Sequence, residues 1–231
     1  MQGRGLKRLI VIDGPAASGK STLARRMAWK LGLPFLSTGA LYRAVTWFAI
    51  TRGVKWGNSR ALVRLARKIR PRFVVYRGGF GLKVMLGRRD ILPELDGADV
   101  SRLTSAYTAS DLAVRQAIVE NARKYLTGRG LVAEGRDCGS VIFPEAPFKI
   151  FLTSDPAERA RRRYHDLRKA GERISLRKLV RDMVRRDRED RTRKRGALVA
   201  MPDAWIVDNT FLQQHQTIRI LLRRVRPDVV A

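Results

Sequence analysis

The chain has 231 residues, 45% of them hydrophobic and 30% charged, so it is long and apolar enough to bury a core, and disorder is excluded as its main state. Its 48 Lys and Arg against 21 Asp and Glu leave a formal charge of +27, which indicates polyanionic partners: nucleic acid, an anionic membrane or phosphorylated small molecules. A single cysteine, Cys138, excludes an internal disulfide framework and a cysteine-based zinc site, and the apolar runs are too short to cross a bilayer, so we expect a soluble, cytoplasmic protein.

The first part of the chain repeats a strand, a loop and a helix. Residues 9–12 are a short β-branched run, typical of a strand buried on both faces. Residues 20–31 predict a helix, with apolar side chains at Leu23, Met27 and Leu31 and with Gly32 as a stop. A second apolar stretch at 34–36 leads into another helical pattern from residue 41. This repeat predicts an α/β fold built on a parallel sheet.

The middle of the chain breaks this pattern. Residues 72–76 and 82–86 predict an antiparallel hairpin joined by the stretch 77–81, and we interpret residues 55–105 as an inserted subdomain. The α/β pattern resumes with a helix at 112–126 and strands at 130–133, 149–152 and 205–208. A basic amphipathic helix completes the chain.

Residues 159–195 are unusually basic, with 17 Lys or Arg among 37 residues and sparse apolar positions at helical spacing. They predict a helical hairpin with little core of its own. Few buried apolar contacts would hold such a hairpin to the rest of the fold, so it is a candidate for motion.

A phosphate-binding P-loop lies between the first predicted strand and helix. The P-loop pattern is a glycine, four residues of any type and then Gly-Lys-Ser or Gly-Lys-Thr. The chain matches it with Gly14 and with Gly19-Lys20-Ser21. Backbone N–H groups and the positive end of the helix form an anion cradle, where Lys20 would reach the β- and γ-phosphates and Ser21 would place its hydroxyl on Mg²⁺. The motif predicts a purine nucleoside triphosphate with Mg²⁺ as ligand. The candidate residues are Gly14, Pro15, Ala16, Ala17, Ser18, Gly19, Lys20, Ser21 and Thr22.

Three further segments complete a pattern that resembles the bacterial cytidylate kinases, within the nucleoside monophosphate kinase family. They are TGALYR at 38–43, EGRD at 134–137 with VIFP at 141–144, and RDREDRTR at 186–193, in the family's order. The resemblance implies a three-layer α/β/α P-loop kinase domain over 1–231, with a monophosphate-binding insert at 55–105 and an arginine-rich lid at 157–196. It also implies transfer of the γ-phosphoryl group of ATP to CMP or dCMP, with Mg²⁺ as cofactor.

The acceptor site implied by these motifs combines guanidinium groups with one carboxylate. Arg43 and Arg136 could converge on the acceptor phosphate at the carboxyl ends of the strands, where guanidinium forks suit a phosphate dianion. Asp137 would accept a hydrogen bond from the exocyclic amine of cytosine, whereas the carbonyl of uracil would meet it lone pair to lone pair. By resemblance, Arg115 would contact the cytosine ring. The candidate substrate-binding residues are Thr38, Tyr42, Arg43, Arg115, Gly135, Arg136, Asp137, Arg186, Asp190 and Arg193.

The lid supplies three of these residues by the same resemblance. Asp190 would reach the ribose, and Arg186 and Arg193 would reach the phosphates and stabilise the charge that develops during transfer. The candidate catalytic residues are Lys20, Arg136, Arg186 and Arg193. A strong general base is not required, because the acceptor phosphate is already an anionic nucleophile.

The chain departs from the family pattern at three places. An aspartate commonly stands at the position of Ser37, so its role is either lost or moved to Thr38. The family's cytosine-facing serine falls on Ala106, with Ser105 beside it, which leaves the strictness against UMP open. The usual Ala-Pro-Leu after the lid reads GAL at 196–198.

Two alternatives remain open at this stage. One is a P-loop kinase for another acceptor, such as UMP or shikimate. The other is a nucleic-acid-binding P-loop protein, suggested by the charge of +27. Because aromatic residues make up only 7% and no base-stacking motif is present, we expect nucleic-acid binding to be incidental. We expect a monomer.

Overall fold

The computed structural model describes residues 6–55, 57–76, 79–104, 108, 111–126, 128–169, 171–194 and 196–230. At its centre is a five-stranded parallel sheet with the strand order β2-β6-β1-β7-β8. The strands are β1 (Leu9–Asp13), β2 (Phe35–Ser37), β6 (Leu131–Gly135), β7 (Phe148–Thr153) and β8 (Trp205–Asp208).

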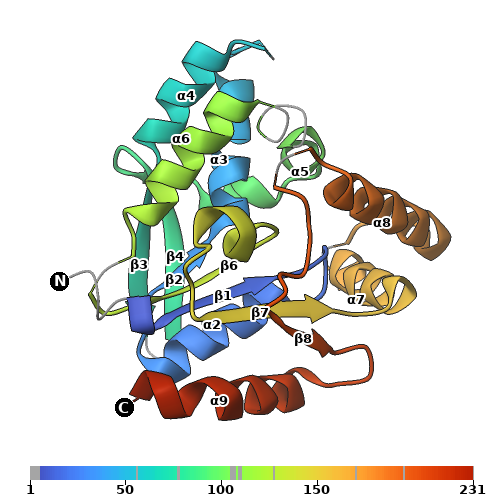
Figure 1. Ribbon diagram of the computed structural model, residues 1–231. Coiled ribbons are helices and arrows are strands. Elements are labelled where there is room, and N and C mark those ends of the chain that lie inside the picture. The colour runs from blue at the N-terminus through green and yellow to red at the C-terminus, as the bar shows by residue number, and fades with distance from the viewer. Residues whose placement is uncertain are drawn as a thin grey trace.

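Helices cover both faces of this sheet (Figure 1). The helices α2 (Lys20–Leu31) and α9 (Gln214–Val230) lie on one face, and α3 (Thr38–Thr51) and α6 (Leu112–Arg123) lie on the other. Every residue of β1 and β6 is therefore buried, as parallel strands with both faces covered require. The three layers confirm the predicted α/β fold, and α2 has the predicted bounds.

The N-termini of α2 and α3 lie at the carboxyl edge of the sheet. Gly19, with φ of 87°, turns the chain into α2. The side chain of Ser37 accepts a hydrogen bond from the N–H of Ala40 at 3.4 Å and so begins α3 directly after β2. Both helices therefore direct their positive ends toward the same edge of the sheet.

The segment between α3 and α6 contains a second sheet, antiparallel, with the strand order β3-β4-β5. The predicted hairpin is confirmed, but β4 begins earlier than expected, because the ladder with β3 extends to the pair Tyr76 and Gly79. The predicted loop 77–81 was therefore too long. The elements of this segment are α4 (Ser59–Lys68), β3 (Arg70–Tyr76), β4 (Gly79–Leu86), β5 (Arg89–Asp90), the 3-10 helix η1 (Leu92–Asp96) and α5 (Ala98–Thr104).

The basic segment forms the predicted helical hairpin. The helices α7 (Pro156–Lys169) and α8 (Leu176–Arg191) pack against each other and stand to one side of the sheet in Figure 1. Their contact buries a small cluster, Ala160, Leu167, Leu179 and Met183, that is separate from the main core. Within the described residues, no helix is long and apolar enough to span a membrane.

Candidate active site at the carboxyl edge of the sheet

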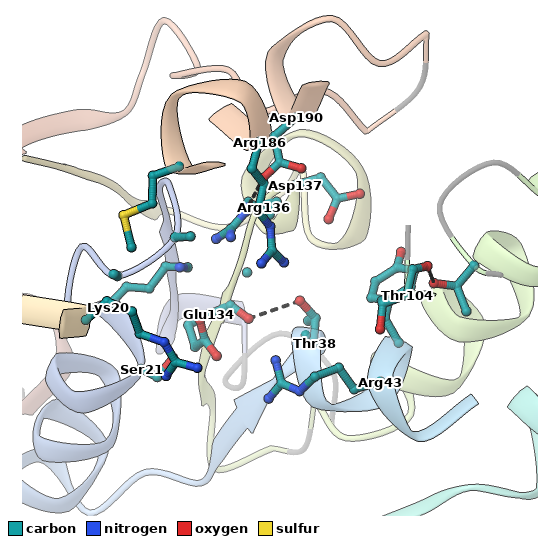
Figure 2. Close-up of a pocket in the computed structure, with 18 of the residues that line it drawn as sticks. Lys20, Ser21, Thr38, Arg43, Thr104, Glu134, Arg136, Asp137, Arg186 and Asp190 are labelled. Atoms are coloured by element: carbon teal, nitrogen blue, oxygen red, sulfur yellow. Dashed lines mark hydrogen bonds and ion pairs between the residues drawn. The ribbon is translucent and has the colours of Figure 1, made fainter. Parts of the chain in front are cut away.

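A cavity of about 490 Å³ lies between the carboxyl edge of the sheet and the hairpin α7–α8. Lys20, Arg136 and Arg186 direct their charged ends into it from three different segments (Figure 2). Its wall carries seven basic side chains and five acidic ones. The basic residues are Lys20, Arg43, Arg115, Arg136, Arg163, Arg186 and Arg193, and the acidic residues are Glu134, Asp137, Asp166, Asp182 and Asp190.

The loop after β1 packs closely against the end of β7. Gly14 has φ of 155°, and a Cβ atom there would collide with the carbonyl oxygen of Leu152, so only glycine fits. The Nζ atom of Lys20 donates a hydrogen bond to the carbonyl oxygen of Pro15 at 3.0 Å, so the side chain folds back over its own loop. Within the predicted P-loop set, Ala16, Ala17, Lys20 and Ser21 line the cavity, whereas Pro15 borders a second cavity behind the loop and Gly14, Ser18, Gly19 and Thr22 line neither.

Lys20 is a buried cation whose charged form is destabilised by its surroundings. Lys20 is only 7% exposed. Burial lowers the pKa of its ammonium group to about 7, and the positive charge of Arg136 contributes to the decrease. The carboxylates of Glu134 and Asp13 oppose that decrease. Among the residues that the structure describes, Lys20 forms no ion pair, and a phosphate group in the cavity would supply an anionic partner.

The residues around Lys20 also fit a Mg²⁺ ion bound through phosphate. Ser21 lies on the cavity wall next to Lys20 (Figure 2). In the part of the chain that the structure describes, no group of three or more His, Cys, Asp or Glu side chains could hold a metal on its own. An ion here would depend on the Ser21 hydroxyl and on phosphate oxygens, which is the donor set that Mg²⁺ accepts in P-loop proteins.

Arg136 connects three parts of the site. It follows β6, its Nη1 atom donates to the carbonyl oxygen of Gly14 at 2.7 Å, and its Nε atom donates to Asp190 Oδ2 at 2.8 Å. The other carboxylate oxygen of Asp190 pairs with Arg193 at 2.6 Å. The turn after β6, the P-loop and α8 are thus joined through a single guanidinium group. Both oxygens of Asp190 are engaged by arginines, and its contact with a ribose stays a prediction.

Asp137 forms a buried ion pair with Arg115 of α6 and not with its neighbour Arg136. Burial raises the pKa of Asp137, and the charge of Arg115 opposes that rise. The Arg115 guanidinium also lies over the ring of Tyr42, 5.5 Å from its centre. The hydroxyl of Tyr42 is buried and has no hydrogen-bond partner among the described residues, so this wall retains unused hydrogen-bonding capacity.

Glu134 supplies a carboxylate beside the start of α3. Ser37 and Glu134 are opposite each other in the register of β2 and β6, and the Ser37 hydroxyl donates to the Glu134 carboxylate. The hydroxyl of Thr38 donates to the backbone oxygen of Glu134 at 3.0 Å (Figure 2). The sequence alternatives for the missing aspartate were loss or transfer to Thr38. In the structure, Ser37 at this position binds the carboxylate of Glu134, a residue of the EGRD motif on the neighbouring strand.

Two threonines that the sequence analysis missed complete the wall opposite Lys20. Thr104 and Thr108 line the cavity, and Figure 2 shows Thr104 across the space from Lys20. The Thr108 hydroxyl donates to the Thr104 carbonyl at 2.6 Å. Ser105 and Ala106, on which the base contact was considered, lie outside the described residues. The hydroxyl-rich run at 104–108 was the signal that could have identified both threonines.

The predicted acceptor and lid residues lie around the same cavity. Thr38, Tyr42, Arg43, Arg115, Gly135, Arg136, Asp137, Arg186, Asp190 and Arg193 all line it. The hairpin α7–α8 adds residues that were not predicted: Arg163, Asp166, Leu179, Asp182 and Met183. Their helical spacing on α7 and α8 was visible in the sequence, but which face of each helix turns toward the core was not.

Comparison with known proteins gives one consistent result. A family model described as cytidylate kinase matches residues 10–227. A cytidylate kinase of Methylococcus capsulatus is 38% identical over 218 residues, which cover 94% of this chain and 96% of that protein. A cytidylate kinase of Pelotomaculum thermopropionicum is 40% identical, covering 94% and 95%, and one of Rhodopirellula baltica is 39% identical, covering 96% and 94%.

Proposed function

Because the chain belongs to the cytidylate kinase family, we propose that the cavity between the P-loop and the hairpin α7–α8 is where it acts on its substrates. The protein is an ATP-dependent kinase that transfers a phosphoryl group to CMP or dCMP. The roles of individual residues are our proposal. The observation that supports them best is the convergence of basic side chains from the P-loop, α3, α6, the turn after β6 and the lid on one cavity.

The P-loop holds the triphosphate of ATP. Its backbone N–H groups and the N-terminus of α2 bind the phosphate oxygens, and Lys20 leaves the Pro15 carbonyl to bind the β- and γ-phosphates. Ser21 and the phosphates would hold Mg²⁺, which would offset negative charge on the transferring group. Lys20 carries its proton throughout, because the neighbouring phosphates restore the pKa that burial lowers.

Arg43 and Arg136 hold the phosphate of CMP opposite the γ-phosphate. Both guanidinium groups line the cavity, and Arg136 reaches the P-loop through the Gly14 carbonyl. This arrangement orients an acceptor oxygen, already anionic, toward the phosphorus atom without a general base. Binding of the acceptor phosphate offers Arg136 a stronger partner than the Gly14 carbonyl.

Asp137 and Arg115 select the base. They form a buried pair at the wall that also carries Tyr42. A carboxylate in this position accepts a hydrogen bond from the cytosine amine, and Arg115 donates to the ring. A uracil carbonyl would face the carboxylate with lone pairs only. Because the pair is buried, the mismatch is costly and separates the two bases.

The lid, for which we propose the bounds 157–196, closes on both nucleotides. Arg186 and Arg193 place positive charge beside the transferring group, and the closed lid excludes water that would hydrolyse ATP. The insert at 55–105 contributes the Thr104 wall on the acceptor side. A monomeric state, a cytoplasmic location and only incidental nucleic-acid binding remain predictions.

Steady-state turnover with CMP, dCMP and UMP tests the assignment of the base site. We expect Asp137→Asn to narrow or reverse the preference for CMP over UMP, measured as the ratio of kcat/KM values, because an amide can donate to a carbonyl. Asp166→Asn is the matched control, since it makes the same change on the lid wall of the same cavity. An unchanged ratio in Asp137→Asn would remove this residue from the base site.

A further inference from the structure

The last residue of β1 carries a carboxylate that the proposed reaction does not use. Asp13 precedes Gly14 of the P-loop and is 6% exposed. Its Oδ1 atom accepts a hydrogen bond from the backbone N–H of Cys138 at 2.9 Å, and its Oδ2 atom accepts one from that of Gly139 at 2.7 Å. Those residues begin the turn that directly follows Arg136 and Asp137.

This turn has an uncommon form that needs such a partner. Residues Cys138–Ile142 make a single π-helical turn, a form that is rare and concentrated at functional sites. The N–H groups of Val141 and Ile142 bond to the carbonyl of Asp137, but the first N–H groups of a helical turn have no carbonyl inside it. Asp13 accepts hydrogen bonds from two of these groups, the N–H groups of Cys138 and Gly139.

Close packing around Gly139 keeps the contact short. A Cβ atom at this position would lie 3.2 Å from Lys149 Cδ, which is closer than an ordinary van der Waals contact. It would lie 3.4 Å from Asp13 Oδ2, which is at the limit of one. Glycine therefore lets the backbone of the turn approach the carboxylate.

A second contact runs in parallel with the first. Asp13 is opposite Gly135 in the register of β1 and β6, and the next residue, Gly14, accepts the hydrogen bond from Arg136 at 2.7 Å. Asp13 at the end of β1 and the next residue, Gly14, thus accept hydrogen bonds from both sides of the segment that carries Arg136 and Asp137. This is a short path between the phosphate cradle and the acceptor site.

We propose that Asp13 is a positioning residue, which holds the acceptor-binding turn at a constant distance and orientation from the P-loop. Asp13 does not line the cavity and acts through Arg136 and Asp137, so the inference rests on the roles proposed for those two residues. In-line phosphoryl transfer needs the acceptor oxygen close to the γ-phosphorus, and a displacement of about 1 Å costs about 100-fold in rate.

The charges around Asp13 are consistent with a retained carboxylate. Burial raises the pKa of Asp13 to about 6, the two backbone hydrogen bonds oppose that rise, and the negative charge of Asp137 adds to it. Lys20 is held closer to its charged state by Asp13, and the buried thiol of Cys138 is held in its neutral state partly by the same charge. An ionised carboxylate buried near a second carboxylate lowers the free energy of unfolding, and this cost argues for a role of Asp13 beyond packing.

The test is Asp13→Asn, a variant of equal size in which one acceptor becomes an NH₂ group that faces a backbone N–H. We expect KM for CMP to rise about 10-fold and kcat to fall about 10- to 100-fold, with KM for ATP within about twofold of wild type. The matched control is Asp90→Asn. Asp90 also accepts two backbone hydrogen bonds, from Val84 and Leu92 at 3.1 Å each, but in the second sheet. In Asp90→Asn, KM for CMP should stay within about twofold of the wild-type value.

Amide hydrogen exchange gives an independent readout. The N–H groups of Cys138 and Gly139 should be protected in wild type and should exchange faster in Asp13→Asn, while the amides of β6 stay protected. Gly139→Ala serves as a second variant if Asp13→Asn does not fold. It adds a methyl group next to Asp13 Oδ2 and the Lys149 side chain while the carboxylate stays intact, and any displacement of the turn should raise KM for CMP in the same direction.

The outcomes separate this inference from the proposed function. Equal rises in KM for CMP and ATP, or a lower melting temperature with unchanged kinetics, would show that Asp13 has a general structural role and would overturn the inference. If Asp137→Asn shifts the base preference while Asp13→Asn leaves KM for CMP unchanged, only the inference fails. If Asp137→Asn has no effect, the assignment of the base site fails first.

Discussion

Replacing Lys20 with methionine should remove catalysis and at the same time stabilise the protein. Methionine keeps the length and the apolar stem of lysine, so the packing at the start of α2 is retained. Loss of the cation removes the contact proposed for the β- and γ-phosphates, and we expect kcat to fall by at least about 100-fold. The gain in stability follows from the burial of an ammonium group that has no anionic partner in the loop.

The magnitude can be worked from the pKa of Lys20. A decrease from 10.5 to about 7 corresponds to about 5 kcal/mol of folding free energy, at about 1.4 kcal/mol for each pKa unit. The variant loses the hydrogen bond to the Pro15 carbonyl, which costs about 1–3 kcal/mol. The net gain is about 2 kcal/mol or more, and for a chain of this size it raises the melting temperature by about 4–8 °C.

The assay is thermal unfolding in a phosphate-free buffer between pH 6 and pH 10. Between pH 7 and pH 10.5 the unfolded state keeps the Lys20 proton that the folded state has lost, so wild-type stability rises with pH in this range. The cost of burial is fully present below pH 7. The advantage of Lys20→Met should therefore be largest below pH 7 and shrink toward pH 10. Lys30→Met, at the exposed end of α2, is the control and should change stability by less than about 0.5 kcal/mol at any pH.

Either of two results would contradict a destabilising charge at Lys20. A melting temperature of Lys20→Met at or below that of wild type would mean that Lys20 is not a destabilising buried cation. A stabilisation that does not change with pH would mean that its origin is apolar packing and not the cost of the charge.

Three further predictions concern the two glycines and the buried carboxylate. Gly14→Ala should abolish turnover, because its Cβ collides with the end of β7; retention of more than about a tenth of kcat would show that the P-loop relaxes around the methyl group. Gly196→Ala should raise KM for CMP about 10-fold with KM for ATP unchanged, because its Cβ would collide with the Arg115 and Asp137 side chains and its φ of 62° disfavours alanine; equal changes in both KM values would argue against this. Since burial raises the pKa of Asp13 to about 6, wild-type KM for CMP should rise as pH falls from 7 to 5 more steeply than KM of Asp13→Asn, which lacks this titrating group; parallel pH profiles of the two KM values would contradict this prediction.

The fold was largely predictable because its signals are local. The buried β-branched run of β1, the P-loop and the helix α2 follow one another within 23 residues, and each part restricts the next. The predicted hairpin and the lid were also local patterns. The helix α4 was missed although Asn58 caps it by accepting a hydrogen bond from the N–H of Ala61, because its capping residue lies in a stretch interpreted only as an insert.

The site was predictable as a set of residues but not as a set of contacts. The ordered motifs contain Arg43, Arg136 and Asp137, the family resemblance added Arg115, and all four line one cavity. The sequence assigned Asp137 and Arg115 to the same base site, but it did not indicate that they pair with each other across 22 residues, as they do in the structure. Likewise, the carboxylate near α3 comes from β6, because strand register brings Ser37 opposite a residue 97 positions away.

By itself, the amino-acid sequence determined which chemical groups this protein has and the local backbone that carries the phosphate cradle, since turn, cap and periodicity rules act over a few residues. Only the tertiary structure decided which of 48 basic side chains share a cavity and which carboxylate each one meets. The physical reason is that these pairings depend on strand order and register. Parallel strands joined by long crossovers align their carboxyl ends irrespective of the distance between them in the chain.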